Sequence, residues 1–408
     1  MYRKVISYPC TVSIILSISA ILYGSNLMTR EMAENTRISE HALMPGIVIP
    51  TFDKTNLEAK FIRELTDRKD DESRSSYIQS QLNHHLIDSF PYEWTTTTPF
   101  RTISGLNTIC LIRAYRSTGV EAIQVVIRLE DTHAVAMAMA IAVHARDNLY
   151  WSRDIYFIFV SNGEIGLNAY MEEYYGIRRI NRTRTTTGSF IVGAIVLETP
   201  EYLAREYTVH VQVIGINGQL PNLDLFNSIA RIGHRGRNQL NIMIYPLDET
   251  NVNHDLSFVP YRFLLTQAFT GVEGIHSVYA KYGVQAVTIR CPRMRNGNEG
   301  RSEYLIEGIL RSMNNLHERF HQSYFLYILE SPSSFISIAY YLPIVALLIT
   351  PLLIFSLNEW NHIHSNSLSP HGGLPLLFII GLSSILSIHP LSSYSSITEV
   401  YCNRDTIL

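Results

Sequence analysis

One carboxylate of this sequence follows a strand in the place where α/β proteins carry ligand sites. Ile155–Val160 is an unbroken run of β-branched and aromatic residues, which predicts a strand buried on both faces. The polar turn Ser161–Gly166 follows and contains Glu164. Open α/β sheets bind ligands just past the carboxyl ends of central strands, so Glu164 is a candidate site residue. It suits equally well the first turn of the next helix, expected from Leu167, where the macrodipole stabilises an anion.

The elements around Glu164 alternate between strand and helix patterns. This alternation predicts one α/β domain over residues 51–334, with a mostly parallel sheet flanked by helices. Further strands are expected at Pro91–Thr98, Leu106–Ala114, Ala122–Leu129, Phe190–Leu197, Val209–Ile214 and Gln285–Ile289, and helices at Leu57–Arg68, Ser73–Ile87, Ala134–Arg146, Leu223–Arg231, Val259–Thr270 and Arg301–His321.

Long apolar stretches without charge indicate membrane anchoring. Val5–Tyr23 follows Arg3-Lys4 and lacks a clear cleavage site, so we favour an uncleaved signal anchor over a cleaved signal peptide. Retention of the basic pair in the cytosol would place the following domain in the lumen. Phe335–Leu357 reaches the roughly 20 residues that a span requires, and the Ser-rich Leu374–Pro390 is a weaker second span. The expected order is a cytosolic N-terminus and anchor (1–24), a lumenal stalk (25–50), the α/β domain (51–334), spans at 335–357 and 374–390, and a polar tail (391–408).

Charge, cysteines and a sequon add weaker constraints. The net charge of −3 gives no global field that would attract nucleic acid. Cys110 and Cys291 could pair in an oxidising lumen, but their spacing has no metal signature and two buried free thiols are favoured. Asn181 begins an Asn-Arg-Thr sequon in a polar, Thr-rich loop, which is consistent with glycosylation on a lumenal surface.

Three motifs stand out along the chain: Tyr150–Ile155 (YWSRDI), Gly215–Leu225 (GINGQLPNLDL) and Met313–Tyr327 (MNNLHERFHQSYFLY). Together they resemble the GPI anchor attachment protein 1 family. The order of one N-terminal span, a large lumenal α/β domain and later membrane segments agrees with that family over roughly Met1–Pro343. The resemblance implies an accessory subunit of the glycosylphosphatidylinositol (GPI) transamidase of the endoplasmic reticulum membrane. In such complexes a separate caspase-like cysteine protease subunit performs the acyl transfer, while this subunit assists assembly and brings the GPI lipid.

The domain also resembles, more distantly, the fold of two-zinc aminopeptidases. Such enzymes hold zinc with carboxylates and imidazoles and use a free Glu as the general base. Carried onto this chain, the pattern makes Glu164, Glu198 and His276 a remnant metal set, with Asp131 a poor fourth member. The His-x-Asp order is absent, and Gly163 stands at the position of the base. The resemblance therefore implies no catalytic residue and no required cofactor, and leaves room for one residual metal ion. The alternative is a membrane-anchored zinc aminopeptidase.

The Gly215–Leu225 motif has both a structural and a functional interpretation. Asn217-Gly218 forms turns readily, and Pro221 suits a helix start with Asp224 in the first turns. The functional alternative is a binding surface for a partner subunit, with Asn217, Gln219 and Asp224 as the contact candidates.

The C-terminal region departs from the resembled family. Family members continue through several more spans, which contribute to contact with the GPI lipid, whereas Leu374–Pro390 and a polar tail follow here. This departure puts lipid recognition in doubt and leaves a purely structural scaffold as a third hypothesis.

Overall fold

A computed structural model describes twelve segments of the chain, which fall into two compact units. The larger unit comprises Asn35–His254 and Arg262–Phe335, and the smaller comprises Met1–Glu34, Asp255–Tyr261 and Ile336–Leu408. The described residues are 15–20, 22–23, 33–97, 101–177, 189–200, 203–204, 208–235, 240–245, 259–269, 274–294, 300–316 and 318–365. Asn181, the span at 374–390, the tail at 391–408 and most of the N-terminal anchor lie outside them.

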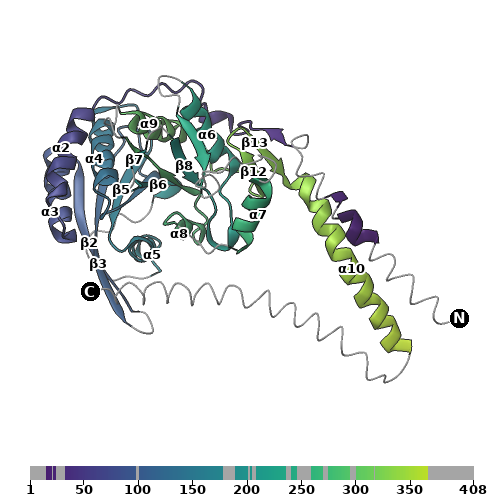
Figure 1. The fold of residues 1–408 in the computed structure, drawn as a ribbon. Coiled ribbons are helices and arrows are strands. Elements are labelled where there is room, and N and C mark those ends of the chain that lie inside the picture. Colours follow the sequence, from purple (N-terminus) through teal and green to yellow (C-terminus); the bar gives the residue numbers. More distant parts are fainter. Residues whose placement is uncertain are drawn as a thin grey trace. The chain divides into compact units, whose positions relative to one another are not determined.

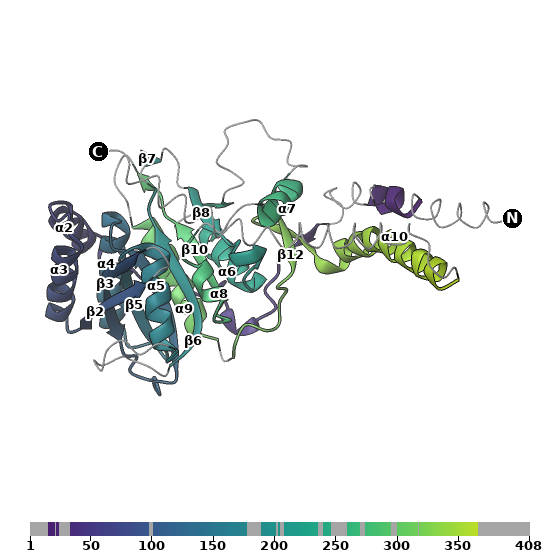
Figure 2. The same ribbon diagram turned by 90° about the horizontal axis from the view of Figure 1, so that it is seen from below.

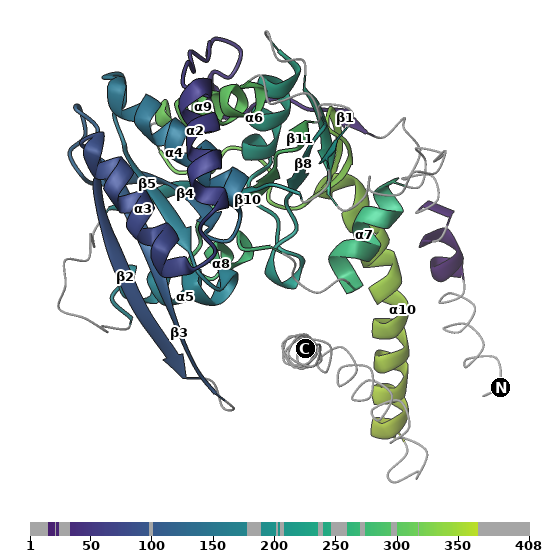
Figure 3. The ribbon, with the colours of Figure 1, turned by 60° about the vertical axis from the view of Figure 1, so that its left-hand side comes forward.

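An eight-stranded sheet forms the centre of the larger unit (Figure 1). Its order is β2-β3-β5-β4-β6-β10-β8-β9. The neighbours β5, β4, β6 and β10 run parallel, while β3 pairs with β5 and β8 pairs with β10 in the antiparallel sense. The long pair β2 and β3 lies at one edge (Figure 3). The strands are β2 (Asp88–Thr97), β3 (Thr102–Ile112), β4 (Glu121–Arg128), β5 (Asp154–Val160), β6 (Phe190–Glu198), β8 (Thr208–Gln212), β9 (Asn241–Ile244) and β10 (Ala286–Arg290).

Helices cover both faces of this sheet, which confirms the predicted α/β class. Helix α4 packs on β3 to β6 from one side and also contacts α2 and α9, whereas α5 and α8 pack together from the other side (Figures 1 and 2). All seven residues of β5 are buried, as its apolar run predicts. The helices are α2 (Thr55–Thr66), α3 (Asp71–His84), α4 (Thr132–Asp147), α5 (Gly163–Tyr174), α6 (Leu223–His234), α7 (Val259–Phe269), α8 (Ser277–Ala280) and α9 (Arg301–Asn314).

Short elements complete the described segments. They are β1 (Glu34–Asn35), η2 (His41–Leu43), β7 (Leu203–Ala204), η3 (Ile216–Gly218), β11 (Arg293–Met294), β12 (Tyr327–Ser331) and β13 (Ser334–Ser337). Cys110 and Cys291 are both buried and free, as favoured from their spacing.

The predicted stalk and the last predicted helix of the domain differ from the structure. Asn35–Pro50 belongs to the larger unit rather than to a stalk, because Leu43 is fully buried and its carbonyl accepts a 2.7 Å hydrogen bond from Ser312 Oγ. Helix α9 ends at Asn314 rather than continuing to His321. Its last carbonyls, those of Met313 and Asn314, accept hydrogen bonds from the Arg153 guanidinium instead of continuing the helix.

The smaller unit contains α10 (Ile338–Ser365), whose segment Ile338–Ser356 is long and apolar enough to cross a membrane. The predicted span at Phe335–Leu357 overlaps this segment, and its first three residues, Phe335–Ser337, belong to β13.

Candidate functional site

The carboxyl edge of the parallel strands carries a cluster of charged side chains. Arg128 ends β4, Glu198 ends β6 and Arg290 ends β10, and Arg290 pairs with Glu198 in the strand register. The Nε of Arg290 lies 3.1 Å from Glu198 Oε2, and the Nε of Arg128 lies 3.6 Å from Oε1. Each oxygen of this carboxylate therefore faces a guanidinium group.

Glu164 stands beside this cluster, in the first turn of α5. Burial raises its pKa above the ordinary value, although Arg128 and the backbone N–H of Gly274 act in the opposite direction. Gly163 precedes it at φ +52°, and a Cβ built there would lie 3.6 Å from Arg128 Cζ. The residue at the expected base position thus has a left-handed backbone, which glycine tolerates and glutamate does not. The Arg128 guanidinium also lies against this position.

His276 is a buried member of the domain core rather than a free imidazole. Its Nδ1 lies 2.8 Å from Thr288 Oγ1, and its Nε2 lies 3.2 Å from the carbonyl oxygen of Ile214. Burial lowers its pKa to about 4, so the ring is neutral at physiological pH. Both nitrogens already have protein partners, so neither is available to a metal ion.

The predicted remnant metal set does not fit this geometry. Within the described segments, no group of three His, Cys, Asp or Glu side chains could hold a metal ion. Glu198 is engaged by two arginines, His276 by Thr288 and Ile214, and guanidinium groups carry the positive charge that a metal would supply. Asp131 is a helix cap, since its oxygens accept from the backbone N–H groups of Ala134 and Thr199.

The Gly215–Leu225 motif folds as its structural interpretation predicts. Asn217 and Gly218 adopt left-handed conformations, with φ of 54° and 69°, and Gln267 Nε2 donates to the Gly218 carbonyl. Asn222 caps α6 by accepting from the backbone N–H of Asp224. Asn217 and Gln219 are exposed and stay candidates for partner contact.

Asp224 is not a surface residue, which corrects its prediction as a partner contact. Its side chain is fully buried, and its Oδ2 accepts from the backbone N–H groups of Ser39 and Glu40 at 3.0 and 2.7 Å. Glu40 Oε1 in turn accepts from the N–H groups of His321 and Gln322, both at 2.8 Å. Through Glu40, these hydrogen bonds connect α6 to the segment that follows α9 and hold that segment in place.

Hydrogen bonds between the Gly215–Leu225 and Met313–Tyr327 motifs continue this bracing. The N–H of Leu223 donates to the Tyr324 carbonyl at 2.9 Å, and the hydroxyl of Tyr327 donates to the Pro221 carbonyl at 2.9 Å. Phe325 and Leu326 lie between these two bonds and are 39% and 55% exposed. Two apolar side chains are thus presented to solvent from a segment held at both ends.

The Tyr150–Ile155 motif holds the end of α9. Asn314 Oδ1 accepts from the backbone N–H groups of Ser152 and Arg153. The buried Arg153 guanidinium donates to the carbonyl of Asn314, the last residue of α9, and to that of Leu316 just beyond it. Arg153 Nε also lies 2.8 Å from Glu121 Oε2. All three motifs therefore serve the larger unit structurally.

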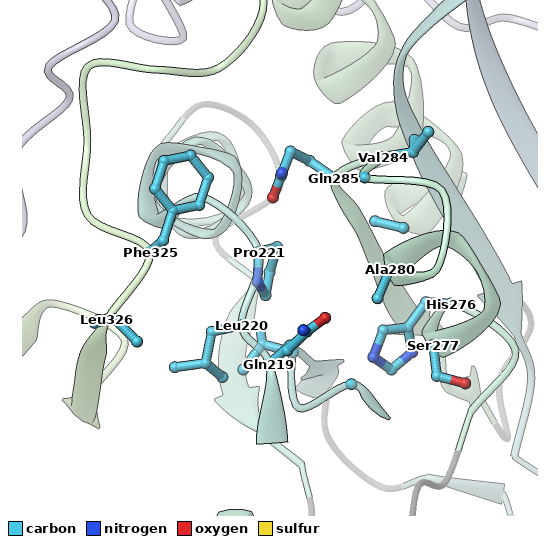
Figure 4. A pocket seen from close by; sticks show the side chains of 14 residues that line it. Gln219, Leu220, Pro221, His276, Ser277, Ala280, Val284, Gln285, Phe325 and Leu326 are labelled. Atoms are coloured by element: carbon cyan, nitrogen blue, oxygen red, sulfur yellow. The ribbon is translucent and has the colours of Figure 1, made fainter. Parts of the chain in front are cut away.

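A pocket of about 290 Å³ opens between the Gly215–Leu225 motif and the segment that follows α9. Figure 4 shows Phe325 and Leu326 on one side, Ala280 and Val284 on the other, and Pro221 between them. Its lining also includes Gln219, Leu220, His276, Ser277 and Gln285.

Sequence reasoning overlooked Arg128, Arg290 and Glu40. A signal was available for the two arginines, because each stands directly after the buried residues of its strand, as Glu198 does. The contact of Glu40 with His321 and Gln322 had no local signal, since the partners are far apart in sequence.

The fold and the strand ends define an α/β protein whose carboxyl edge carries arginines paired with Glu198, and which has a helix long and apolar enough to cross a membrane. The chain belongs to the family described as Gaa1-like, GPI transamidase component, whose model matches residues 104–373. This match confirms the resemblance that the three motifs carry.

Two curated relatives have the same family name. The GPI transamidase component GAA1 of Saccharomyces cerevisiae is 28% identical over 86% of this chain and 58% of its own length. The gaa1 component of Schizosaccharomyces pombe is 25% identical over 85% of this chain and 64% of its own length. The chain thus spans about three fifths of these relatives.

Among solved structures, the chain is similar to an aminopeptidase and a glutaminyl cyclase. The Legionella pneumophila LapA aminopeptidase matches 69% of this chain and 75% of its own, at 10% identity and a TM-score of 0.43. The Fimbriiglobus ruber glutaminyl cyclase matches 66% and 98%, at 11% identity and a TM-score of 0.43.

Proposed function

We propose that this chain is a non-catalytic membrane subunit of the GPI transamidase complex. It would support attachment of GPI anchors to proteins in the endoplasmic reticulum by helping the complex to assemble and by presenting the GPI lipid. The partners would be the other transamidase subunits, including the caspase-like cysteine protease subunit. Family membership supports the assignment to the complex.

The pairing of Glu198 with Arg128 and Arg290 is the observation that carries the non-catalytic assignment. A two-zinc hydrolase needs carboxylates free to bind metal and a carboxylate base near the bridging water. Here the candidate carboxylate faces two guanidinium groups and the base position is Gly163. These features weigh against the alternative of a membrane-anchored zinc aminopeptidase.

Co-purification tests the proposal. The full tagged chain, solubilised from membranes, should carry the cysteine protease subunit with it. It should contain less than stoichiometric zinc and release no product from aminoacyl substrates. A chain that purifies without that subunit would refute the complex assignment, and turnover lost on Glu164→Gln would establish the peptidase instead.

The lumenal orientation is a separate part of the proposal and rests on the sequon at Asn181 and on Arg3-Lys4. Glycosidase treatment should lower the apparent mass of the chain on a gel by the mass of one glycan, and Asn181→Gln should abolish that shift. Thr187→Ala, a few positions further along the sequence and outside the sequon, is the matched control. A protease-protected domain is expected in sealed microsomes, and digestion of the domain from outside would contradict the orientation.

A further inference from the structure

The pocket beside Phe325 and Leu326 has an uncharged lining. No residue among the lining positions that the structure describes is Asp, Glu, Lys or Arg. His276, the one titratable ring in the wall, stays neutral because both of its nitrogens contact protein groups inside the core. A charged ligand group would lose its hydration here without gaining an opposite charge. The occupant is therefore expected to be uncharged.

Neutral amides accompany the apolar walls. The carboxamide of Gln219 is exposed at the pocket, and Gln285 Oε1 accepts from the Asn222 backbone N–H at 2.8 Å. Carboxamides donate and accept like the peptide group itself, so they suit the backbone on either side of an inserted side chain. The volume of about 290 Å³ lies at the lower end of the roughly 300–1,000 Å³ of small-molecule pockets. It suits one or two side chains of a larger partner.

The rim has the features of a protein-binding surface. Phe325 and Leu326 are exposed beside the half-buried Leu220, and the bonds Leu223–Tyr324 and Tyr327–Pro221 fix them in place. Aromatic side chains beside well-packed pockets, such as Phe325 here, are typical of the energetic centre of interfaces, and apolar neighbours such as Leu326 help to exclude water. Because the segment is already braced, little further ordering is needed when a partner binds.

We propose that this pocket binds an uncharged, extended segment of another transamidase subunit, which inserts one aliphatic or aromatic side chain between Ala280 and Leu326. The inference rests on the proposed function, because the partner is a subunit of that complex. Removing one such side chain from water stabilises the complex, so the pocket can anchor one part of a larger interface.

Photocrosslinking in the purified complex tests this site. The full chain carrying Leu326→p-benzoylphenylalanine is irradiated after co-purification, and the crosslinked peptides are mapped by mass spectrometry. One peptide of another subunit is expected, with an uncharged stretch around an aliphatic or aromatic residue at the crosslink. Leu86→p-benzoylphenylalanine, at a position that is 76% exposed, is the control and should not capture that peptide.

Two blocking variants make the result specific to the pocket. Ala280→Trp fills it, and Gln219→Arg places a charge at an exposed position that should not affect folding. Each should lower the crosslink yield about tenfold or more, with the unfolding temperature checking the fold. Complexes that purify intact but crosslink position 326 only to lipid, to a second copy, within the chain or to a charged segment would overturn the inference. Absence of all other subunits would instead refute the proposed function, and the inference with it.

Discussion

At the scale of single residues, Arg128 and Arg290 determine the chemistry of the carboxyl edge, because they neutralise the carboxylate that a metal site would need. The sequence predicts Glu164 and Glu198 at this edge, since each follows a buried apolar strand. It does not predict that Arg128 reaches Glu198 and Gly163. That meeting depends on the strand order β5-β4-β6, which no local pattern specifies.

We expect the left-handed backbone at position 163 to require glycine for full stability. Gly163→Ala should lower the free energy of unfolding by about 1 kcal/mol, because φ of +52° disfavours a Cβ although the space beside Arg128 admits one. Gly163→Asn should lose less, since Asn tolerates left-handed backbone better. Chemical denaturation of the three proteins measures the order, and an Ala variant as stable as wild type would contradict it.

At the scale of elements, most strands and helices follow from local pattern, while their ends depend on distant partners. The apolar face of Arg301–His321 predicts one long helix, yet α9 stops at Asn314. Arg153 and Ser152, which hold that end, belong to a different part of the chain. Local periodicity carries no information about them.

Arg153 is therefore expected to stabilise the C-terminal end of α9. Arg153→Met should reduce the free energy of unfolding by about 2–4 kcal/mol, because it leaves carbonyls at and just beyond the end of α9, and the Glu121 carboxylate, without their donor. Arg113→Met, at an exposed position just after β3, is the matched control and should change little. Equal losses in both variants would show that the capping contacts are unimportant.

A buried carboxyl pair couples α2 to α9 and should make stability depend on pH. Burial, followed by the charge of Glu303, raises the pKa of Glu58 to about 9. The folded chain therefore keeps a proton that the unfolded chain loses above its ordinary pKa of 4.5. Stability contributed by this pair is present below pH 4.5 and is lost as the pH rises toward 9.

Glu58→Gln replaces the titrating carboxyl with a carboxamide, so the difference in bound protons between the folded and unfolded chain at this position disappears. At pH 8 the free energy of unfolding of the variant should be about 1–3 kcal/mol higher than that of wild type. It should also vary less between pH 5 and pH 9. Thermal unfolding across that range measures both effects, with the exposed Glu72→Gln in α3 as control. If the free energy of unfolding changed with pH in the same way in wild type and variant, the proton held by Glu58 in the folded chain would be contradicted.

At the scale of the whole molecule, the three family motifs meet within the larger unit and brace the segment between α9 and β12. The motifs identify the family from sequence, but they do not predict that the three segments meet in space. That meeting depends on distant contacts such as the one between Asp224 and Glu40. The corrected role of Asp224 follows from the same cause. A carboxylate in the first turn of a helix looks exposed from local pattern alone, and a distant backbone buries it.

The central claim is that the chain serves the transamidase without performing its chemistry. The most direct measurement is GPI attachment to a reporter protein in cells that depend on this chain, comparing wild type with Glu164→Gln at equal expression. We predict attachment within about twofold of wild type, because the proposed function gives the Glu164 carboxylate no catalytic role, whereas removing a group that takes part in acid–base catalysis typically costs about 10²–10⁴-fold. A loss of that size, with the complex still assembled, would contradict the account.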